Sequence, residues 1–476
     1  MGDKRQSAPG DKAGDKALKR CKQKMADAGV DPVAIDTFAH YWRLVQHGET
    51  GMIPESAIEP VDMPALADVE VSEETASEAI RATAVIKLNG GLGTSMGMDR
   101  AKSLLCVRRG MSFLDVIARQ VQHLRREHAA PLPLILMNSF RTSADSLAAL
   151  ARYDDLPVEG LPLEFLQNKE PKILVDSLEP VTWLDDPDLE WCPPGHGDIY
   201  TALRGTGLLD RLIDAGYRYV FCSNSDNLGA VPDPRVAGWF AQSGASFAIE
   251  AVRRDANDKK GGHFARRLSD GRLVLRETAQ TLPEDKEALA DLDRHRFAST
   301  NNVWIDLRAL RAELDRRDGI LGLPLIRNEK TVDPADKQSP KVLQLETAMG
   351  AAIEVFEDAA LIEVGRDRFV PVKNTAQLML LRSDCYTVGE DFVLDLGPEH
   401  TPYVDLDGPY SLVKDFDKRF PAGVPSLKEA TSLVVHGDWV FGEGVRVRGD
   451  VELDEPGGQR RVDAGTVLGE EAPAPV

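Results

Sequence analysis

A glycine-rich loop that directly follows a β-prone run is the feature of this sequence that most limits its fold. Residues 83–87 (TAVIK) predict a buried strand, and residues 88–97 (LNGGLGTSMG) follow it with four glycines in eight positions. Glycine keeps side chains away from the backbone N–H groups, and oriented N–H groups bind anions. Lys102 stands five residues after the loop and can complete the positive charge. The segment therefore predicts a site for phosphate groups.

The spacing of the loop excludes two common phosphate-binding motifs. A Walker A loop requires a glycine, four further residues and then Gly-Lys-Ser or Gly-Lys-Thr, whereas Ala101 precedes Lys102 here. A dinucleotide fingerprint requires Gly-x-Gly-x-x-Gly, and Met96 occupies the position of its third glycine. Taken alone, the loop leaves a second interpretation open, which is a glycine-rich turn without a ligand.

Length and composition narrow the class of protein. A chain of 476 residues predicts more than one domain. The net charge of −20 argues against a nucleic-acid partner but not against a nucleotide, which needs only local positive charge. The five cysteines are scattered without a Cys-x-x-Cys pair, which predicts reduced thiols. We find neither a long apolar run nor an apolar segment behind Met1, so we expect a cytoplasmic protein without a membrane span.

Five segments differ in composition and periodicity. Residues 1–25 predict a disordered or loosely helical tail, and residues 26–82 predict an N-terminal helical segment. Residues 83–388 alternate strand-like runs with helical stretches, which predicts an α/β domain with a mainly parallel sheet. Residues 389–470 predict a C-terminal β-solenoid domain, and residues 471–476 predict a frayed tail.

The solenoid prediction depends on residues 432–453. There, short β-prone pieces are punctuated by glycine, as in the rungs of a small β-solenoid. A plain array of β-hairpins has a similar periodicity and stays open as the alternative.

Further motifs follow the glycine loop in the order found in one enzyme family. They lie at residues 192–200 (CPPGHGDIY), 223–230 (SNSDNLGA), 299–304 (STNNVW), 344–352 (QLETAMGAA) and 368–373 (RFVPVK). With the loop, they make the chain resemble the eukaryotic-type UTP–glucose-1-phosphate uridylyltransferases (UDP-glucose pyrophosphorylases) over roughly residues 40 to 470.

The resemblance implies both a fold and a reaction. The fold is a Rossmann-like, glycosyltransferase-A-like nucleotidyltransferase domain with a small C-terminal parallel β-helix domain. The reaction converts UTP and glucose 1-phosphate into UDP-glucose and pyrophosphate, by direct in-line attack on the α-phosphorus with Mg²⁺ as cofactor. Because both reactants are anions, cations and backbone amides are expected to carry this chemistry.

The resemblance also implies the residues of the UTP site. Lys102 and Lys373 are the expected catalytic cations. Gln167 is expected to read the amide edge of uracil, since a carboxamide offers one donor and one acceptor. The full set for UTP is Leu88, Asn89, Gly90, Gly91, Lys102, Gln167, Gly195 and Lys373.

The metal and the sugar phosphate have their own candidates. Asp226 follows the buried run of residues 219–222, and ligands of open α/β sheets bind beyond the carboxyl ends of strands. A carboxylate there can hold Mg²⁺ against phosphates, although an aspartate that caps the turn is the alternative. For the sugar phosphate the resemblance implies His196, Asn224, Asn301, Asn302 and Glu346.

Two departures from the family pattern stand out. Arg100-Ala101 replaces the Gly-Pro pair that commonly precedes the lysine, so we expect a looser loop. The family usually has Phe-Asn-Thr-Asn-Asn, whereas residues 297–302 are FASTNN, so the first asparagine is replaced and only Asn301 and Asn302 are carried over.

Other functions stay open at this point. One is a pyrophosphorylase for another hexose 1-phosphate, although the form of the glycine loop favours glucose. Another is a non-catalytic scaffold that binds nucleotide sugars, although a scaffold has little use for both Lys102 and Lys373 together with the candidate metal ligand Asp226. The short C-terminal segment favours a monomer or a weak homo-oligomer formed through the C-terminal domain.

Overall fold

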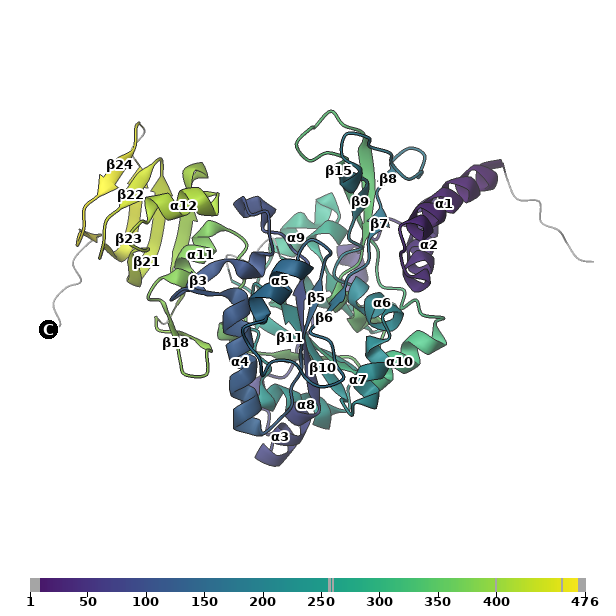
Figure 1. Ribbon diagram of the computed structural model, residues 1–476, viewed down its shortest axis with the longest axis horizontal. Coiled ribbons are helices and arrows are strands. Elements are labelled where there is room, and N and C mark those ends of the chain that lie inside the picture. Colours follow the sequence, from purple (N-terminus) through teal and green to yellow (C-terminus); the bar gives the residue numbers. More distant parts are fainter. Residues whose placement is uncertain (1–8, 256–257, 259–260, 399, 455–456, 470–476) are drawn as a thin grey trace, which may run out of the picture. The chain divides into compact units, whose positions relative to one another are not determined.

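The computed structural model describes residues 9–255, 258, 261–398, 400–454 and 457–469 (Figure 1). The chain forms two compact units, each built from three separate segments. The first unit comprises Met1–Ile86, Glu159–Cys222 and Asp233–Val364. The second unit comprises Lys87–Val158, Ser223–Pro232 and Gly365–Val476.

Both units contain helices as well as strands, and the predicted α/β class is confirmed. The helices of the first unit are α1 (Pro9–Asp27), α2 (Pro32–Gln46), α3 (Glu73–Arg81), α6 (Asp198–Gly205), α7 (Leu208–Asp214), α8 (Pro234–Ser243), α9 (Lys286–Ala290) and α10 (Leu307–Arg316). Those of the second unit are α4 (Phe113–His128), α5 (Ser143–Leu150), α11 (Thr375–Arg382) and α12 (Val413–Arg419).

The strands divide in the same way, except that β2 and β10 begin in the first unit and end in the second. The first unit holds β1 (Ile58–Glu59), β2 (Thr83–Asn89), β6 (Glu164–Leu166), β7 (Glu170–Pro171), β8 (Ile173–Leu174), β9 (Trp191–Cys192), β10 (Tyr219–Asn224), β11 (Phe247–Arg253), β12 (His263–Arg267), β13 (Leu273–Arg276), β14 (Phe297–Asp306), β15 (Ile326–Thr331), β16 (Lys341–Glu346) and β17 (Ala360–Glu363). The second unit holds β3 (Cys106–Arg108), β4 (Met111–Ser112), β5 (Leu134–Asn138), β18 (Tyr386–Val388), β19 (Leu394–Leu396), β20 (Tyr403–Leu406), β21 (Ser426–His436), β22 (Trp439–Phe441), β23 (Arg446–Asp454), β24 (Arg460–Val462) and β25 (Val467–Leu468).

The main sheet of the first unit is organised around β14. This strand pairs antiparallel with β10, β11 and β12, while β11 pairs parallel with β17. The alternation of strands and helices in the sequence did not indicate that β14 runs antiparallel to these neighbours. The middle of β10 and the second half of β14 are buried, so they read as apolar runs such as YVFC and VWI.

The N-terminal segment is more ordered than the sequence predicts. We expected a disordered or loosely helical tail over residues 1–25, and this is wrong for the described part, because α1 is a regular helix. Its buried side chains Ala17, Leu18, Cys21 and Met25 recur at helical spacing and belong to the same apolar cluster as Phe38 of α2. Figure 1 shows the two helices, in purple, as a hairpin. Residues 1–8 lie outside the described residues.

The predicted boundary at residue 388 does not separate the two units. The segment Lys87–Val158 instead groups with the C-terminal part of the chain. One cause is visible at Arg108, whose guanidinium donates to the backbone carbonyls of Leu381 and Ser383. Such long-range hydrogen bonds leave no local signal in composition, so the sequence suggested a single domain over residues 83–388.

The C-terminal strands form parallel ladders, as predicted for a solenoid. The strand order is β20-β21-β23-β25, with β22 beside β24. Figure 1 labels β21, β22, β23 and β24 of this domain. Leu433 of β21 pairs with Val451 of β23, and Phe441 of β22 pairs with Val462 of β24, all in parallel register. A hairpin array would give antiparallel pairs, so this alternative is wrong. The predicted frayed tail of residues 471–476 lies outside the described residues.

A bilayer-spanning helix is not found in the part of the chain that the structure describes, since none there combines the required length with the required hydropathy.

Candidate active site

The glycine loop begins at a buried anchor in the second unit. Asn89 ends β2, and its Nδ2 donates to Oδ1 of Asn138 at 2.7 Å and to Oγ of Ser146 at 2.8 Å. The Ser139 hydroxyl donates to the carbonyl of Gly90 at 3.1 Å. Asn89 is 2% exposed, so its side chain fixes the start of the loop rather than facing solvent.

The loop itself lies open on the surface. Its base is closed by a hydrogen bond from the Lys102 N–H to the carbonyl of Gly91 at 3.1 Å. A Cβ added at Gly91 would meet none of the described residues within 4 Å, and Gly91 is exposed. Packing therefore does not require glycine at this position, whereas a ligand close to the backbone would. Ala101 has a φ of −51°, which is close to the angle a proline ring imposes.

Lys102 and Asp226 form an ion pair beside this loop. The distance from Nζ of Lys102 to Oδ2 of Asp226 is 2.6 Å, and the two side chains are 17% and 20% exposed. The other carboxylate oxygen of Asp226, Oδ1, is buried and has no hydrogen-bond partner within the part of the chain that the structure describes. The pair thus places a cation beside a carboxylate oxygen that can still bind a ligand.

The motif of residues 368–373 lies against the loop that carries Asp226. The Val372 N–H donates to the backbone carbonyl of Asp226 at 3.2 Å. Asn227 fixes the same contact, since its Nδ2 donates to the Arg368 carbonyl and its Oδ1 accepts the Val370 N–H. Lys373 comes next and is exposed. The structure thus brings Lys102, Asp226 and the backbone before Lys373 together, and the roles of these residues stay predictions.

A second group of predicted residues lies in the first unit. The turn of residues 194–197 is joined to residues 347–349 by three hydrogen bonds. The Thr347 N–H donates to the Pro194 carbonyl at 3.0 Å, and the Gly197 N–H donates to the Thr347 carbonyl at 2.8 Å. The Met349 N–H donates to Nδ1 of His196 at 2.9 Å.

Gly195 is required by this arrangement. Its φ is +79°, a left-handed conformation that side chains disfavour. A Cβ added there would lie 2.5 Å from the Thr347 carbonyl oxygen. Glycine at this position therefore lets the turn approach residues 346 and 347 closely.

His196 is held as a neutral ring. Because Nδ1 accepts the Met349 N–H, the proton of the ring is on Nε2. Desolvation lowers the pKa of His196 to about 4, although the residue is exposed to solvent. The bond to Nδ1 is the stronger reason for the neutral form, since a protonated Nδ1 cannot accept it. His196 thus presents an Nε2–H donor.

Gln167 is half-buried, and its neighbour Asn168 is fixed by Asp198. The Asp198 carboxylate accepts two hydrogen bonds from Asn168, one from its backbone N–H at 2.6 Å and one from its side-chain Nδ2 at 2.9 Å. Burial raises the pKa of Asp198 to about 6. A cavity of about 30 Å³ adjoins Asp198 and Glu170, which is large enough for a water molecule but not for a nucleotide.

The three sugar candidates of the first unit differ in exposure. Asn301 is half-buried with φ of +58°, and Glu346 is half-buried at the end of β16, where burial raises its pKa. Asn302 is fully buried, and its Nδ2 donates to Glu250 at 3.0 Å. This burial argues against direct contact between Asn302 and a sugar hydroxyl. Direct contact stays a prediction for Asn301 and Glu346, and in the second unit for the half-buried Asn224.

The comparisons with known proteins decide the family. The family model described as UTP–glucose-1-phosphate uridylyltransferase matches residues 35–448. The chain belongs to this family. The uridylyltransferase of Hordeum vulgare is 37% identical over 390 residues, which is 81% of this chain and 80% of that protein. The enzyme of Saccharomyces cerevisiae is 37% identical over 372 residues, which is 77% of this chain and 73% of that protein.

Solved structures of UDP-glucose pyrophosphorylases share the fold. A mutant of the Leishmania major enzyme in complex with UDP-glucose is 46% identical, with a TM-score of 0.90 over 95% of this chain and 98% of that one. A structure described as UDP-glucose phosphorylase from Trypanosoma brucei is 44% identical, with a TM-score of 0.89 over 96% of this chain and 99% of that one. The predicted family, nucleotidyltransferase class and fold are confirmed.

Sequence reasoning missed one residue that lies next to the predicted site. Lys87, near the end of β2, is 1% exposed and donates to two groups of the loop that carries Asp226. The available signal was a lysine within an otherwise apolar β-prone run.

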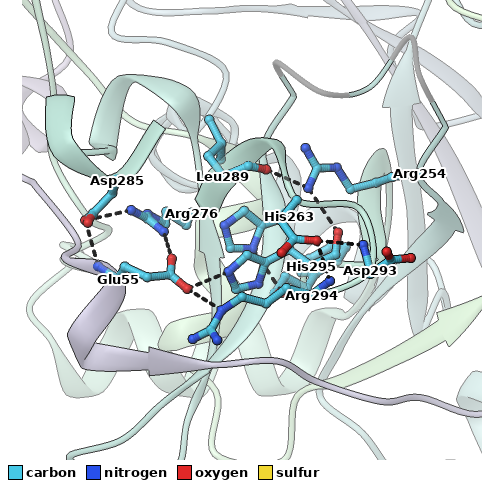
Figure 2. A network of polar contacts seen from close by, with 11 residues as sticks. Glu55, Arg254, His263, Arg276, Asp285, Leu289, Asp293, Arg294 and His295 are labelled. Atoms are coloured by element: carbon cyan, nitrogen blue, oxygen red, sulfur yellow. Dashed lines mark hydrogen bonds and ion pairs between the residues drawn. The ribbon is translucent and has the colours of Figure 1, made fainter. Parts of the chain in front are cut away.

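A buried polar network in the first unit also went unpredicted (Figure 2). Glu55 accepts hydrogen bonds from Arg276, Arg294 and His295. Burial alone would raise the pKa of Glu55, but these bonds lower it to about 2. His263 stacks on His295 with ring centroids 3.7 Å apart, and burial together with the charge of His295 lowers the pKa of His263 to about 3.

Proposed function

We propose that this chain catalyses the reversible transfer of a uridylyl group from UTP to glucose 1-phosphate, with release of pyrophosphate. The observation that carries the proposal is the cluster of Lys102, Asp226 and the backbone before Lys373 next to an open glycine loop. A binding scaffold needs a nucleotide contact. It does not need two lysines and an incompletely bonded carboxylate together.

The phosphates of UTP are assigned to the glycine loop and the two lysines. Backbone N–H groups of the glycine loop are suited to the phosphate oxygens, and the exposed Gly91 leaves room for their approach. Lys102 and Lys373 are proposed to stabilise the charge that spreads over the α-phosphate as the sugar phosphate attacks. The attack is direct and in line, so no covalent enzyme intermediate is required.

Asp226 is proposed as the residue that holds Mg²⁺. Its buried Oδ1 has no partner among the described residues, and a carboxylate oxygen is a suitable ligand for this ion. Among the described residues no cluster of three or more His, Cys, Asp or Glu side chains could hold a metal. This fits an ion that one carboxylate and the substrate phosphates bind together. When bound, Mg²⁺ neutralises phosphate charge.

The uracil and the sugar phosphate have their own proposed residues. Gln167 is proposed to read the uracil edge, and the close turn at Gly195 is proposed to lie against the uridine. His196 offers its Nε2–H to the sugar phosphate as a neutral donor, because its Nδ1 accepts the Met349 N–H. Asn301 and Glu346 are proposed to bind glucose hydroxyls, each of which both donates and accepts.

The test is pyrophosphate release from UTP with a panel of sugar 1-phosphates, with and without Mg²⁺. We expect release with glucose 1-phosphate in the presence of Mg²⁺ and a rate near zero in its absence. Faster release with galactose 1-phosphate or N-acetylglucosamine 1-phosphate would favour the alternative pyrophosphorylase. An absence of release with every sugar would contradict the proposal and leave the scaffold.

Light scattering tests the proposed assembly state. We propose a monomer or a weak homo-oligomer formed through the C-terminal strands, so the mass should lie near that of one chain at low concentration. A stable octamer would contradict this.

A further inference from the structure

A buried lysine connects the two ends of the loop that carries Asp226. The Nζ of Lys87 donates to the hydroxyl of Ser223 at 2.8 Å and to the carbonyl of Ala230 at 2.6 Å. Ser223 and Ala230 are the first and last residues of the motif at residues 223–230, and both are 0% exposed. One ammonium group therefore closes this loop at its base.

The next residue of the chain supports the same loop. The carbonyl of Leu88 accepts the Ser225 N–H at 3.2 Å, so two consecutive residues of β2 bond to the loop. On the other side, the Asp226 carbonyl accepts the Val372 N–H. The Asp226 backbone is thus held between the end of β2 and the segment that leads to Lys373.

Core packing alone does not account for a lysine at position 87. Ile86 before it is 0% exposed, and burial of an ammonium group is unfavourable unless its donors are satisfied. A methionine has a similar length and would fill the space without this cost. Two hydrogen bonds distinguish Lys87 from a methionine at this position, and both end on the Asp226 loop.

We propose that Lys87 is a positioning residue that fixes the Asp226 carboxylate for the metal ion and the phosphates of UTP. The inference rests on the proposed function, because it assumes that Asp226 binds the metal. Lys87 does not contact substrate in this proposal; it acts through the conformation of residues 223–230.

The experiment compares Lys87→Met with a matched control, Thr83→Val. Thr83 is also fully buried in β2, and its hydroxyl donates to the Ala79 carbonyl, away from the Asp226 loop. Two readouts are needed: hydrogen exchange of a peptide covering residues 223–231, and Mn²⁺ binding in the presence of UTP, measured by electron paramagnetic resonance. Activity with UTP and glucose 1-phosphate is recorded alongside.

We expect Lys87→Met to accelerate exchange in this peptide by about tenfold, because two buried acceptors lose their donor. The dissociation constant of Mn²⁺ with UTP should rise by about fivefold or more, the size of effect expected when one hydrogen bond that supports a ligand is lost. Thr83→Val should leave both values unchanged. If Lys87→Met fails to fold, Ser223→Ala, which removes one of the two bonds, should shift both values in the same direction by less.

Two outcomes separate the inference from the function on which it rests. If the wild-type chain converts UTP and glucose 1-phosphate but Lys87→Met leaves Mn²⁺ binding and loop exchange unchanged, the inference is wrong and the proposed function stands. If the wild-type chain shows neither conversion nor Mn²⁺ binding with UTP, the proposed function is wrong and the inference falls with it.

Discussion

The close turn at Gly195 gives a prediction that separates backbone strain from steric contact. We compare Gly195→Ala with Gly207→Ala, since both glycines have left-handed φ angles, +79° and +69°. At Gly207 a Cβ would meet none of the described residues within 4 Å, whereas at Gly195 it would lie 2.5 Å from the Thr347 carbonyl oxygen and 2.9 Å from the Thr347 nitrogen. Gly207→Ala therefore tests the conformational cost alone.

The expected magnitudes follow from these contacts. A left-handed alanine costs about 1–2 kcal/mol, so Gly207→Ala should lower the free energy of unfolding by this amount. Gly195→Ala should lose about 2–5 kcal/mol, because backbone atoms must also shift to relieve the clash. That shift moves the turn that holds His196, and a misplacement of about 1 Å can lower catalysis by about 100-fold.

The assay combines urea unfolding with steady-state kinetics for UTP and glucose 1-phosphate. We expect unchanged kcat/KM for Gly207→Ala and at least a roughly tenfold loss for Gly195→Ala. Equal effects of the two substitutions on both stability and kcat/KM would refute the argument, since the contact with Thr347 would then have no consequence.

Three further predictions concern single side chains. Lys373→Ala should lower kcat by a factor of about 100 or more, as is typical when a charge contact made in the transition state is lost, and a near-normal kcat would contradict its role. Asp226→Asn should abolish the stimulation of turnover by Mg²⁺, and a mutant with a normal Mg²⁺ titration would exclude Asp226 as the ligand. The pKa of His263 in the folded chain is about 3, which is below its ordinary value of 6.5. As the pH falls below 6.5, the unfolded chain therefore binds the proton first, and the free energy of unfolding decreases. Between pH 6.5 and about pH 5, His263→Phe should lose about 2 kcal/mol less of the free energy of unfolding than the wild-type chain, as measured by urea unfolding at both pH values. An unchanged pH dependence of stability would contradict this prediction.

Motifs whose function depends on local backbone shape could be predicted from the sequence. The glycine loop and the Pro-Pro-Gly-His-Gly turn are such cases, since glycine at Gly91 and Gly195 indicates that the backbone comes close to a ligand or to another part of the chain. The β-prone pieces punctuated by glycine suggested a solenoid in the C-terminal domain, and the family resemblance implied its parallel strands. In each case the determining residues are neighbours in the chain.

Burial and long-range pairing could not be predicted in the same way. Asn302 belongs to a family motif, yet its amide is directed to Glu250 in the interior. The helix α1 was missed because its stripe of Ala17, Leu18, Cys21 and Met25 is diluted by lysine and aspartate. Lys87 was passed over because a lone lysine in a strand gives no sign of its acceptors, which lie more than a hundred residues further along.

The network around Glu55 shows the same limit for charged groups. Its members come from separate parts of the first unit, and only the fold brings Arg276 and His295 to one carboxylate (Figure 2). Nothing in the spacing of these residues predicts their contact.

The most direct test of the central claim is the stoichiometry of products formed by the purified full-length chain. With UTP, glucose 1-phosphate and Mg²⁺, the account predicts UDP-glucose and pyrophosphate in equal amounts, with UDP-glucose identified by its mass. Pyrophosphate without UDP-glucose, or neither product, would contradict it.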